Sequence, residues 1–238
     1  MRKLYKSTFG MAAAGVLLVG LAACSTSTAS GTDTGSSAGT GSSSAPTVEA
    51  DPVPLASIPA LAGVDTQVTL DKGFLDAITG LGLTPGVTGT ATLDAATGTL
   101  AFPITGGNVD YYDPNESYRP YVQGEIDHMG SGITLSTADG TTVVGLSDFV
   151  IDPGTSRLTG TVTVNGTVAG EDIFIFNLDG TTLKPLASDA DGNAVLEGTR
   201  VLVSSDAAGL LNDTFKAPGA VPDDFLVGIA KITAKPAS

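Results

Sequence analysis

Apolar and polar residues alternate along much of this chain, and this period of two limits the fold more than any other feature. Within Ser156–Val164, Leu158, Gly160, Val162 and Val164 fall on one face and three threonines fall on the other. Successive side chains of a strand point to opposite faces, so this pattern is typical of a strand buried on one side. We therefore expect a chain built mainly from β-strands.

Short turn signals separate the strand-like runs. They are Thr97-Gly98, Asp139-Gly140, Asn165-Gly166, Asp179-Gly180 and Asp191-Gly192. Asn-Gly and Asp-Gly favour tight hairpins because both positions accept a positive φ. Turn signals spaced roughly 8–12 residues apart are typical of a β-sandwich or barrel. We predict an all-β fold, an antiparallel β-sandwich of immunoglobulin-like architecture.

Two short helices are expected within this β-rich chain. Asp71 is a good N-cap for a helix over Lys72–Thr79, which Gly80 would end. Ser205 is a good N-cap for a second helix over Asp206–Phe215. The carboxylate of the first residue of that helix would lie at its positive end, which favours the helix.

The first 23 residues have the pattern of an export signal. Met1–Lys6 carries three basic residues and no acid, and Phe9–Ala22 is apolar and uncharged. Leu21-Ala22-Ala23-Cys24 follows, and Cys24 is the only cysteine of the chain. A cysteine directly after Leu-Ala-Ala resembles the bacterial lipobox. We predict a lipoprotein signal peptide over 1–23 and a lipid on Cys24, of which palmitate is an expected acyl component.

Two other interpretations of this segment explain its pattern less well. An uncleaved transmembrane anchor needs roughly 20 apolar residues, and this run is shorter and interrupted by Gly10, Gly15 and Gly20. Ordinary cleavage would leave Cys24 as a lone thiol in an oxidising compartment, where it has no partner cysteine. Lipidation accounts for the pattern best, and it places the protein on the extracytoplasmic face of the cell membrane.

The rest of the chain divides into a tether and one domain. Residues 24–47 are almost entirely Ser, Thr, Gly and Ala, so they have too little apolar surface to fold. A flexible tether of this length reaches on the order of 25 Å. Residues 48–238 contain no second linker of this kind, and we predict a single domain there.

The charge of the chain argues against nucleic acid as a partner. Removal of the signal takes away Arg2, Lys3 and Lys6, which lowers the formal charge from −14 to −17. The remaining basic residues are scattered, so no basic stripe exists for phosphate contacts. An acidic domain is also repelled by an anionic membrane, so the lipid on Cys24 would provide the membrane attachment.

The candidate ligand-binding residues cluster in one segment. His128 is the only histidine, and Tyr111, Tyr112, Tyr118 and Tyr121 lie within the seventeen residues before it. Histidine nitrogen and tyrosine oxygen can both ligate a metal, and both hold haem iron in some proteins. The structural alternative is that the tyrosines pack against the edge of the sheet and that His128 is a satisfied polar residue.

Catalysis and a dedicated metal site find little support in the sequence. No Gly-x-Ser-x-Gly motif is present, and one histidine with no free cysteine cannot complete a structural zinc site. A hydrolase using a pair of the 25 acids is the least favoured class. Asp189–Asn193 resembles the start of a calcium loop, but a hairpin turn explains it better. We expect no enzyme, no catalytic residue and no metal site.

Four runs follow one another along the chain: Gly124–Gly130, Gly132–Ser136, Leu146–Ile151 and Leu158–Val162. In that order they resemble the HtaA-type domain of haem-uptake surface proteins of actinobacteria, and the resemblance covers roughly Thr66 to Phe215. It implies a mainly β domain with short helices, and haem held by a tyrosine with a histidine in support. His128 matches that histidine, but Ala77 stands where the family has its tyrosine. One of the four tyrosines near His128 would have to take that place.

Two functions follow as expectations. The first is a lipid-anchored, non-enzymatic binding protein of the cell surface that binds haem through His128 and one of the tyrosines. The second is a structural or adhesive envelope domain that has a protein partner and no small-molecule ligand. A pocket around His128 favours the first, and a partner recovered from envelope material favours the second.

Overall fold

The structure is a computed structural model and describes residues 52–237. The predicted signal peptide, the lipidation site Cys24 and the tether 24–47 lie outside the described residues. Strands and short helices follow each other in this order: β1 (Ala56–Ile58), β2 (Leu61–Leu70), α1 (Lys72–Gly80), β3 (Leu83–Gly89), β4 (Thr92–Asp94), β5 (Thr99–Pro103), β6 (Gly106–Tyr111), β7 (Val122–Thr137), β8 (Val143–Asp152), β9 (Arg157–Val164), β10 (Thr167–Asp179), η1 (Gly180–Thr182), β11 (Ala187–Ser188), β12 (Ala194–Val203), α2 (Ser205–Thr214) and β13 (Leu226–Pro236).

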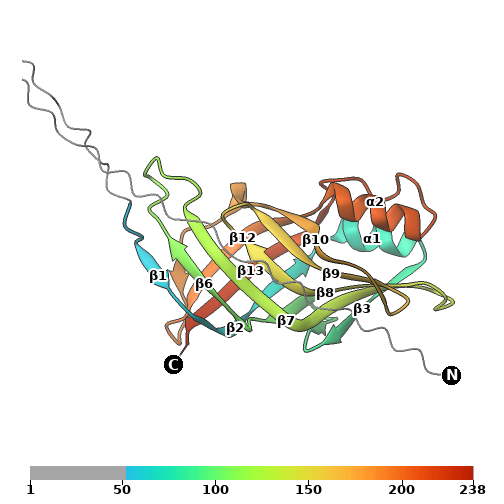
Figure 1. Ribbon diagram of the computed structural model, residues 1–238, viewed down its shortest axis with the longest axis horizontal. Coiled ribbons are helices and arrows are strands. Elements are labelled where there is room, and N and C mark those ends of the chain that lie inside the picture. Colours follow the sequence, from blue (N-terminus) through green and yellow to red (C-terminus); the bar gives the residue numbers. More distant parts are fainter. Residues whose placement is uncertain (1–51, 238) are drawn as a thin grey trace, which may run out of the picture. The chain divides into compact units, whose positions relative to one another are not determined.

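All the strands belong to one antiparallel sheet. Its order is β1-β6-β7-β8-β9-β10-β12-β13-β2-β5-β4, with β3 paired to β7 and β11 paired to β12. The sheet is strongly curled into a half-barrel, and the long strands β7, β12 and β13 cross the width of the molecule (Figure 1). The expected sandwich of two sheets is not what forms. One ladder of hydrogen bonds runs through every strand, and the curl lets this single sheet bury its own concave face.

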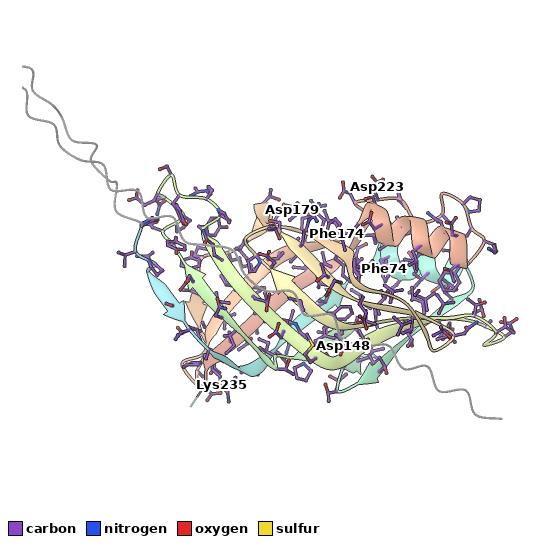
Figure 2. All side chains as sticks on the ribbon, in the orientation of Figure 1. Phe74, Asp148, Phe174, Asp179, Asp223 and Lys235 are labelled. Carbon is purple, nitrogen blue, oxygen red and sulfur yellow. The ribbon has the colours of Figure 1, made fainter. Side chains whose placement is uncertain are left out.

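Both α-helices lie at the same end of the sheet (Figure 1). α1 follows the end of β2, and α2 follows the end of β12. The start of β13 lies between these two strand ends, because Leu226 is opposite Leu202 of β12 and Gly228 is opposite Leu70 of β2. Phe74 of α1 lies on the sheet side of the helices and packs against Phe225, with ring centroids 6.2 Å apart (Figure 2). The helices therefore cover this end of the sheet.

Loops gather at the opposite end. The segment 112–121 joins β6 to β7, and η1 begins the connection from β10 to β12. The turn between β8 and β9 belongs to the same end, because Leu178 donates a backbone hydrogen bond to Ser156. β1 pairs with β6 there, with Ala56 opposite Tyr111. The two ends of the domain thus differ in kind, one covered by helices and the other by loops.

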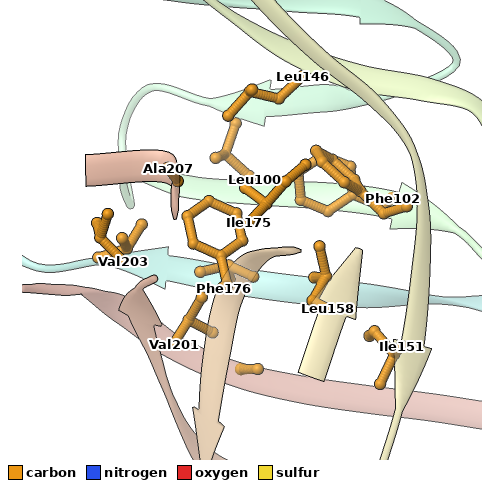
Figure 3. Packing of buried hydrophobic residues seen from close by; sticks show 14 of the residues in the cluster. Leu100, Phe102, Leu146, Ile151, Leu158, Ile175, Phe176, Val201, Val203 and Ala207 are labelled. Atoms are coloured by element: carbon orange, nitrogen blue, oxygen red, sulfur yellow. The ribbon is translucent and has the colours of Figure 1, made fainter. Parts of the chain in front are cut away.

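The core occupies the inside of the curl. Phe102 of β5 and Leu158, Phe176 and Val201 of the neighbouring strands β9, β10 and β12 point inward (Figure 3). Each of these side chains is at most 9% exposed. Burial of such apolar surface supplies most of the stability, since the described residues include no disulfide.

The local sequence signals predicted most elements correctly. Asn165-Gly166 forms the β9–β10 hairpin with positive φ at both residues, and Asp139-Gly140 lies in the β7–β8 turn. Asp71 caps α1 as expected, accepting hydrogen bonds from the amides of Gly73 and Phe74. α2 begins one residue early, because the buried Ser204 hydroxyl, and not that of Ser205, accepts from the amide of Ala207.

Two further features of the described segment bear on function. Neither α1 nor α2 is long and apolar enough to span a bilayer. Asp189–Asn193 forms the turn between β11 and β12, and the Asp189 carboxylate accepts from the backbone amides of Asp191 and Asn193. Within residues 52–237 no group of three or more acidic, histidine or cysteine side chains is placed to hold a metal ion.

Candidate ligand cavity

The curled sheet encloses a cavity of about 450 Å³. Eight strands, two turns and the loop before β7 contribute side chains to it. They are Thr66, Val68, Leu100, Phe102, Arg119, Pro120, Tyr121, Val122, Ile126, His128, Ile133, Phe149, Ile151, Pro153, Ser156, Leu158, Phe176, Leu178, Gly180, Leu183, Leu196, Thr199, Val201, Val227, Ala230 and Ile232. Most of these residues are apolar, and none of them is acidic. The volume lies in the range of small-molecule sites in proteins.

The cavity has a mouth and a floor. We call Arg119, Tyr121, Ser156 and Gly180 the mouth, because they belong to the loop end and three of the four are exposed to solvent. Thr66, Phe102, His128 and Phe149, which we call the floor, are buried. From Val122 to His128 the lining follows β7 for about 20 Å at the usual strand rise. The cavity is therefore elongated along β7.

His128 is the polar centre of the floor. Its side chain is 1% exposed, and its Nε2 lies 2.8 Å from the hydroxyl oxygen of Thr66. Phe102 meets the ring edge-on at 6.5 Å between centroids. No group of the described chain is in hydrogen-bond geometry with Nδ1. A buried polar atom without a partner is uncommon, and it marks a place where a ligand could bind.

The environment of His128 keeps its ring neutral. Burial lowers the pKa of His128 from 6.5 to about 4, because desolvation penalises the charged imidazolium. Backbone groups of Phe149 and Ile126 oppose this shift in pKa without cancelling it. At neutral pH the ring therefore offers one donor and one acceptor nitrogen, and the acceptor can bind a metal ion.

Two facing irregularities in the ladder set the position of His128. The pairing of β7 with β8 shifts register between His128 and Gly132, where Gly130 has φ +73°. Opposite, Asp148 has φ +53°, and its carboxylate accepts a hydrogen bond of 2.8 Å from the Gly130 amide. The Ser131 hydroxyl donates to the His128 carbonyl at 2.9 Å. Bulges of this kind redirect side chains, and this pair bends β7 directly after His128.

Only one of the four candidate tyrosines lines the cavity. Tyr121 does so at the mouth, and buried Tyr111 packs edge-on against it at 6.0 Å between centroids. Tyr112 and Tyr118 pack on each other at 4.7 Å in the loop. The tyrosines thus form two pairs beside the mouth, one edge-on and one tilted, as expected for rings that pack against the edge of a sheet.

The structure does not bring His128 and a tyrosine together. Tyr121 precedes His128 by seven residues of extended chain, a separation of about 23 Å at the usual strand rise. Ala77, at the position of the family tyrosine, lies in α1 and does not line the cavity. One iron could therefore not be held by Tyr121 and His128 at once in this arrangement.

Arg119 at the mouth was not among the residues that sequence reasoning selected. Its guanidinium donates three hydrogen bonds of 2.5–2.7 Å to the backbone carbonyls of Pro114, Glu116 and Tyr118. Its Cζ also lies 5.4 Å from the centroid of the Tyr121 ring. Within residues 52–237 no carboxylate lies within ion-pair distance of Arg119.

Sequence reasoning also did not select Thr66 or Phe102, and only Thr66 has a feature in the sequence that could have indicated it. Thr66 occupies an inward position of β2, two residues before buried Val68, where an apolar residue is usual. Phe102 lies directly opposite Thr66 on β5 and resembles any other core residue in the sequence. The pairing of β2 with β5 is what places both beside His128.

Comparison with known proteins supports the fold. No protein-family model matches the chain, and no curated protein matches it. Among solved structures, the C-terminal domain of HtaA from Corynebacterium glutamicum aligns with a TM-score of 0.50 and 14% identity, over 75% of this chain and 99% of that one. A histidine-to-alanine variant of that domain, a domain-swapped dimer, aligns with a TM-score of 0.42 and 14% identity, over 69% of this chain and 91% of that one. The first alignment shows a shared fold, which agrees with the resemblance in the sequence.

Proposed function

We propose that this chain is a non-enzymatic binding domain related to haem uptake. The observation that carries the proposal is the apolar cavity inside the curled sheet, whose floor holds the one histidine with an unpartnered nitrogen. Cavities lined mainly by apolar groups with a few placed polar atoms are the usual form of small-molecule sites. The fold shared with an HtaA domain makes haem the first ligand to test.

The floor of the cavity suits a haem ligand in two respects. The His128 ring is neutral at physiological pH, so a nitrogen lone pair is available for iron. The hydrogen bond between Nε2 and the Thr66 hydroxyl would orient the ring, as second partners of metal-bound histidines do. Bound haem would supply the iron, and His128 would be its protein ligand. Tyr121 would stay at the mouth.

Haemin titration of the full chain carrying Cys24→Ser tests this function. We expect a shifted Soret band with one haem per chain, and we expect His128→Ala to abolish the shift. Tyr121→Phe keeps the ring and removes the hydroxyl, so it should leave the band unchanged if His128 is the ligand. A Soret shift that survives His128→Ala, or no shift in the parent chain, would contradict the proposal.

We also propose that the domain is tethered to the outer face of the cell membrane by a lipid on Cys24. The support is the signal pattern over 1–23 and the short Ser/Thr/Gly-rich segment after it. Cys24→Ser should move the protein from the membrane fraction to the soluble fraction of the host. Membrane attachment that is unchanged by Cys24→Ser would show that another feature provides the anchor.

A further inference from the structure

We propose that the cavity binds a single-chain fatty acid, with its carboxylate at Arg119 and its alkyl chain extending toward His128. This inference rests on the proposed function only in taking the same cavity as the ligand site. It assigns a different class of ligand and a recognition residue at the mouth. Its basis is the shape of the cavity, the nature of its walls and the position of one cation.

The shape and the walls favour an alkyl chain. The lining runs for about 20 Å along β7, yet the whole cavity has a volume of about 450 Å³. Such an elongated, apolar space suits a flexible chain that contacts the walls along its whole length. Between mouth and floor the walls are almost entirely apolar, with Thr199 the only polar side chain among the lining residues there. Thr199 apart, this length of wall offers apolar contacts.

The mouth favours an acidic head group. Arg119 is the only basic side chain at the mouth of a strongly acidic protein, and no acidic residue lines the cavity. Three of its five N–H donors are bound by loop carbonyls, which fix the guanidinium beside Tyr121. The structure assigns no partner to the other two donors. An arginine can pair with a carboxylate through two such donors.

The entry route follows from this polarity. A carboxylate cannot be buried at the floor, because no cation there would compensate for its lost hydration. The alkyl end must therefore enter first, and the carboxylate stays at the surface. The buried neutral ring of His128 lies at the inner end of the chain and is compatible with an apolar neighbour.

A chain-length series tests the alkyl part. Binding of decanoate, laurate, myristate and palmitate to the full chain with Cys24→Ser is measured by calorimetry. Affinity should rise about four-fold for each added methylene, which corresponds to ~0.8 kcal/mol, until the cavity is filled. An affinity that does not depend on chain length would overturn the assignment.

The head-group part is tested with Arg119→Met, which keeps the length of the side chain and removes its charge. Palmitate should bind at least about five-fold more weakly to this variant, because a paired carboxylate at a partly enclosed mouth exceeds an exposed ion pair in strength. The methyl ester of palmitate should bind both proteins equally. Arg157→Met is the matched control, because Arg157 stacks on Phe174 and does not line the cavity. The role of Arg119 would be overturned if Arg119→Met lowered the affinity for palmitate and for its methyl ester equally. It would also be overturned if Arg157→Met lowered the affinity for palmitate as much as Arg119→Met does.

The same samples separate this inference from the haem proposal. A His128-dependent Soret shift without palmitate binding would refute the fatty-acid assignment and leave the haem proposal standing. Palmitate binding that depends on Arg119, without a Soret shift, would refute the haem proposal and leave the fatty-acid assignment standing. Binding of neither ligand would refute both. If both bind, palmitate should compete with haemin, and binding without competition would contradict a shared cavity.

Discussion

At the scale of single residues, His128 is an ionisable side chain buried among apolar ones. Burial removes the water that would solvate an imidazolium, and the contacts with the Thr66 hydroxyl and with the backbone of Phe149 and Ile126 do not replace it. The unpartnered Nδ1 and the lowered pKa of His128 have the same cause, a floor built of apolar side chains. A ligand that binds Nδ1 would satisfy the one buried polar side-chain atom that lacks a partner in the described chain.

The lowered pKa predicts how the stability depends on pH. The unfolded chain takes up a proton at His128 near pH 6.5 and the folded chain only near pH 4, so the unfolded state binds more protons between these values. The free energy of unfolding should fall by about 3 kcal/mol as the pH drops from 6.5 to 4. Urea unfolding across this range measures the loss.

His128→Gln provides the comparison for this prediction. It removes the titrating group and keeps a polar side chain, so the fall between pH 6.5 and 4 should largely disappear. The carboxylates with lowered pKa, such as Asp139 and Asp179, contribute stability that is lost only at lower pH, as the pH falls through their folded pKa values. If the free energy of unfolding depended on pH in the same way in the parent chain and in His128→Gln, His128 would not be the group responsible.

At the scale of elements, close contact between β6 and β7 shapes the wall beside His128. Gly107 has φ +106°, and a Cβ built there would lie 2.0 Å from the carbonyl oxygen of Glu125 on β7. Only glycine permits both the backbone conformation and the approach of the two strands. The close approach of β6 and β7 at this point therefore depends on the absence of a side chain at Gly107.

Substitution at this contact should be more destabilising than positive φ alone explains. Gly107→Ala adds a clash with a carbonyl to the strain of its φ, and it should cost about 3 kcal/mol or more. Gly140 also has a positive φ, +69°, which lies near the left-handed helical region, and no atom lies within 4 Å of its Cβ, so Gly140→Ala should cost only about 1 kcal/mol. Chemical denaturation of both variants tests the difference, and equal losses would contradict it.

At the scale of the whole molecule, one continuous sheet joins the helical end to the loop end. Residues 52–237 should therefore unfold in a single transition. Tyrosine fluorescence reports the mouth, because the four tyrosines of the described chain lie between residues 111 and 121, and far-UV circular dichroism reports the sheet. The two signals should share one midpoint in urea. A tyrosine transition at clearly lower urea would show that the mouth opens independently of the sheet.

Sequence reasoning succeeded for features that are encoded locally. Asn165-Gly166 specifies its hairpin because both residues tolerate positive φ, and Asp71 begins α1 because its carboxylate can accept the first free amides. The choice of Ser204 over Ser205 as the cap of α2 was missed, since it depends on burial of the Ser204 side chain against β10. The candidate site was predicted only in part. His128 and Tyr121 line the cavity, and Arg119 was not foreseen.

By itself the sequence determined that the chain folds mainly into β-strands, where most of its turns and helices lie, and that one histidine has several tyrosines near it. The tertiary structure alone decided that the strands form one curled sheet, that a cavity lies inside it, and that His128 and Tyr121 stand at its two ends. The reason is the separation along the sequence of the residues that interact. Turns and caps depend on a few neighbouring residues, whereas the contact of Thr66 with His128 spans 62 positions and depends on the order in which distant strands pair.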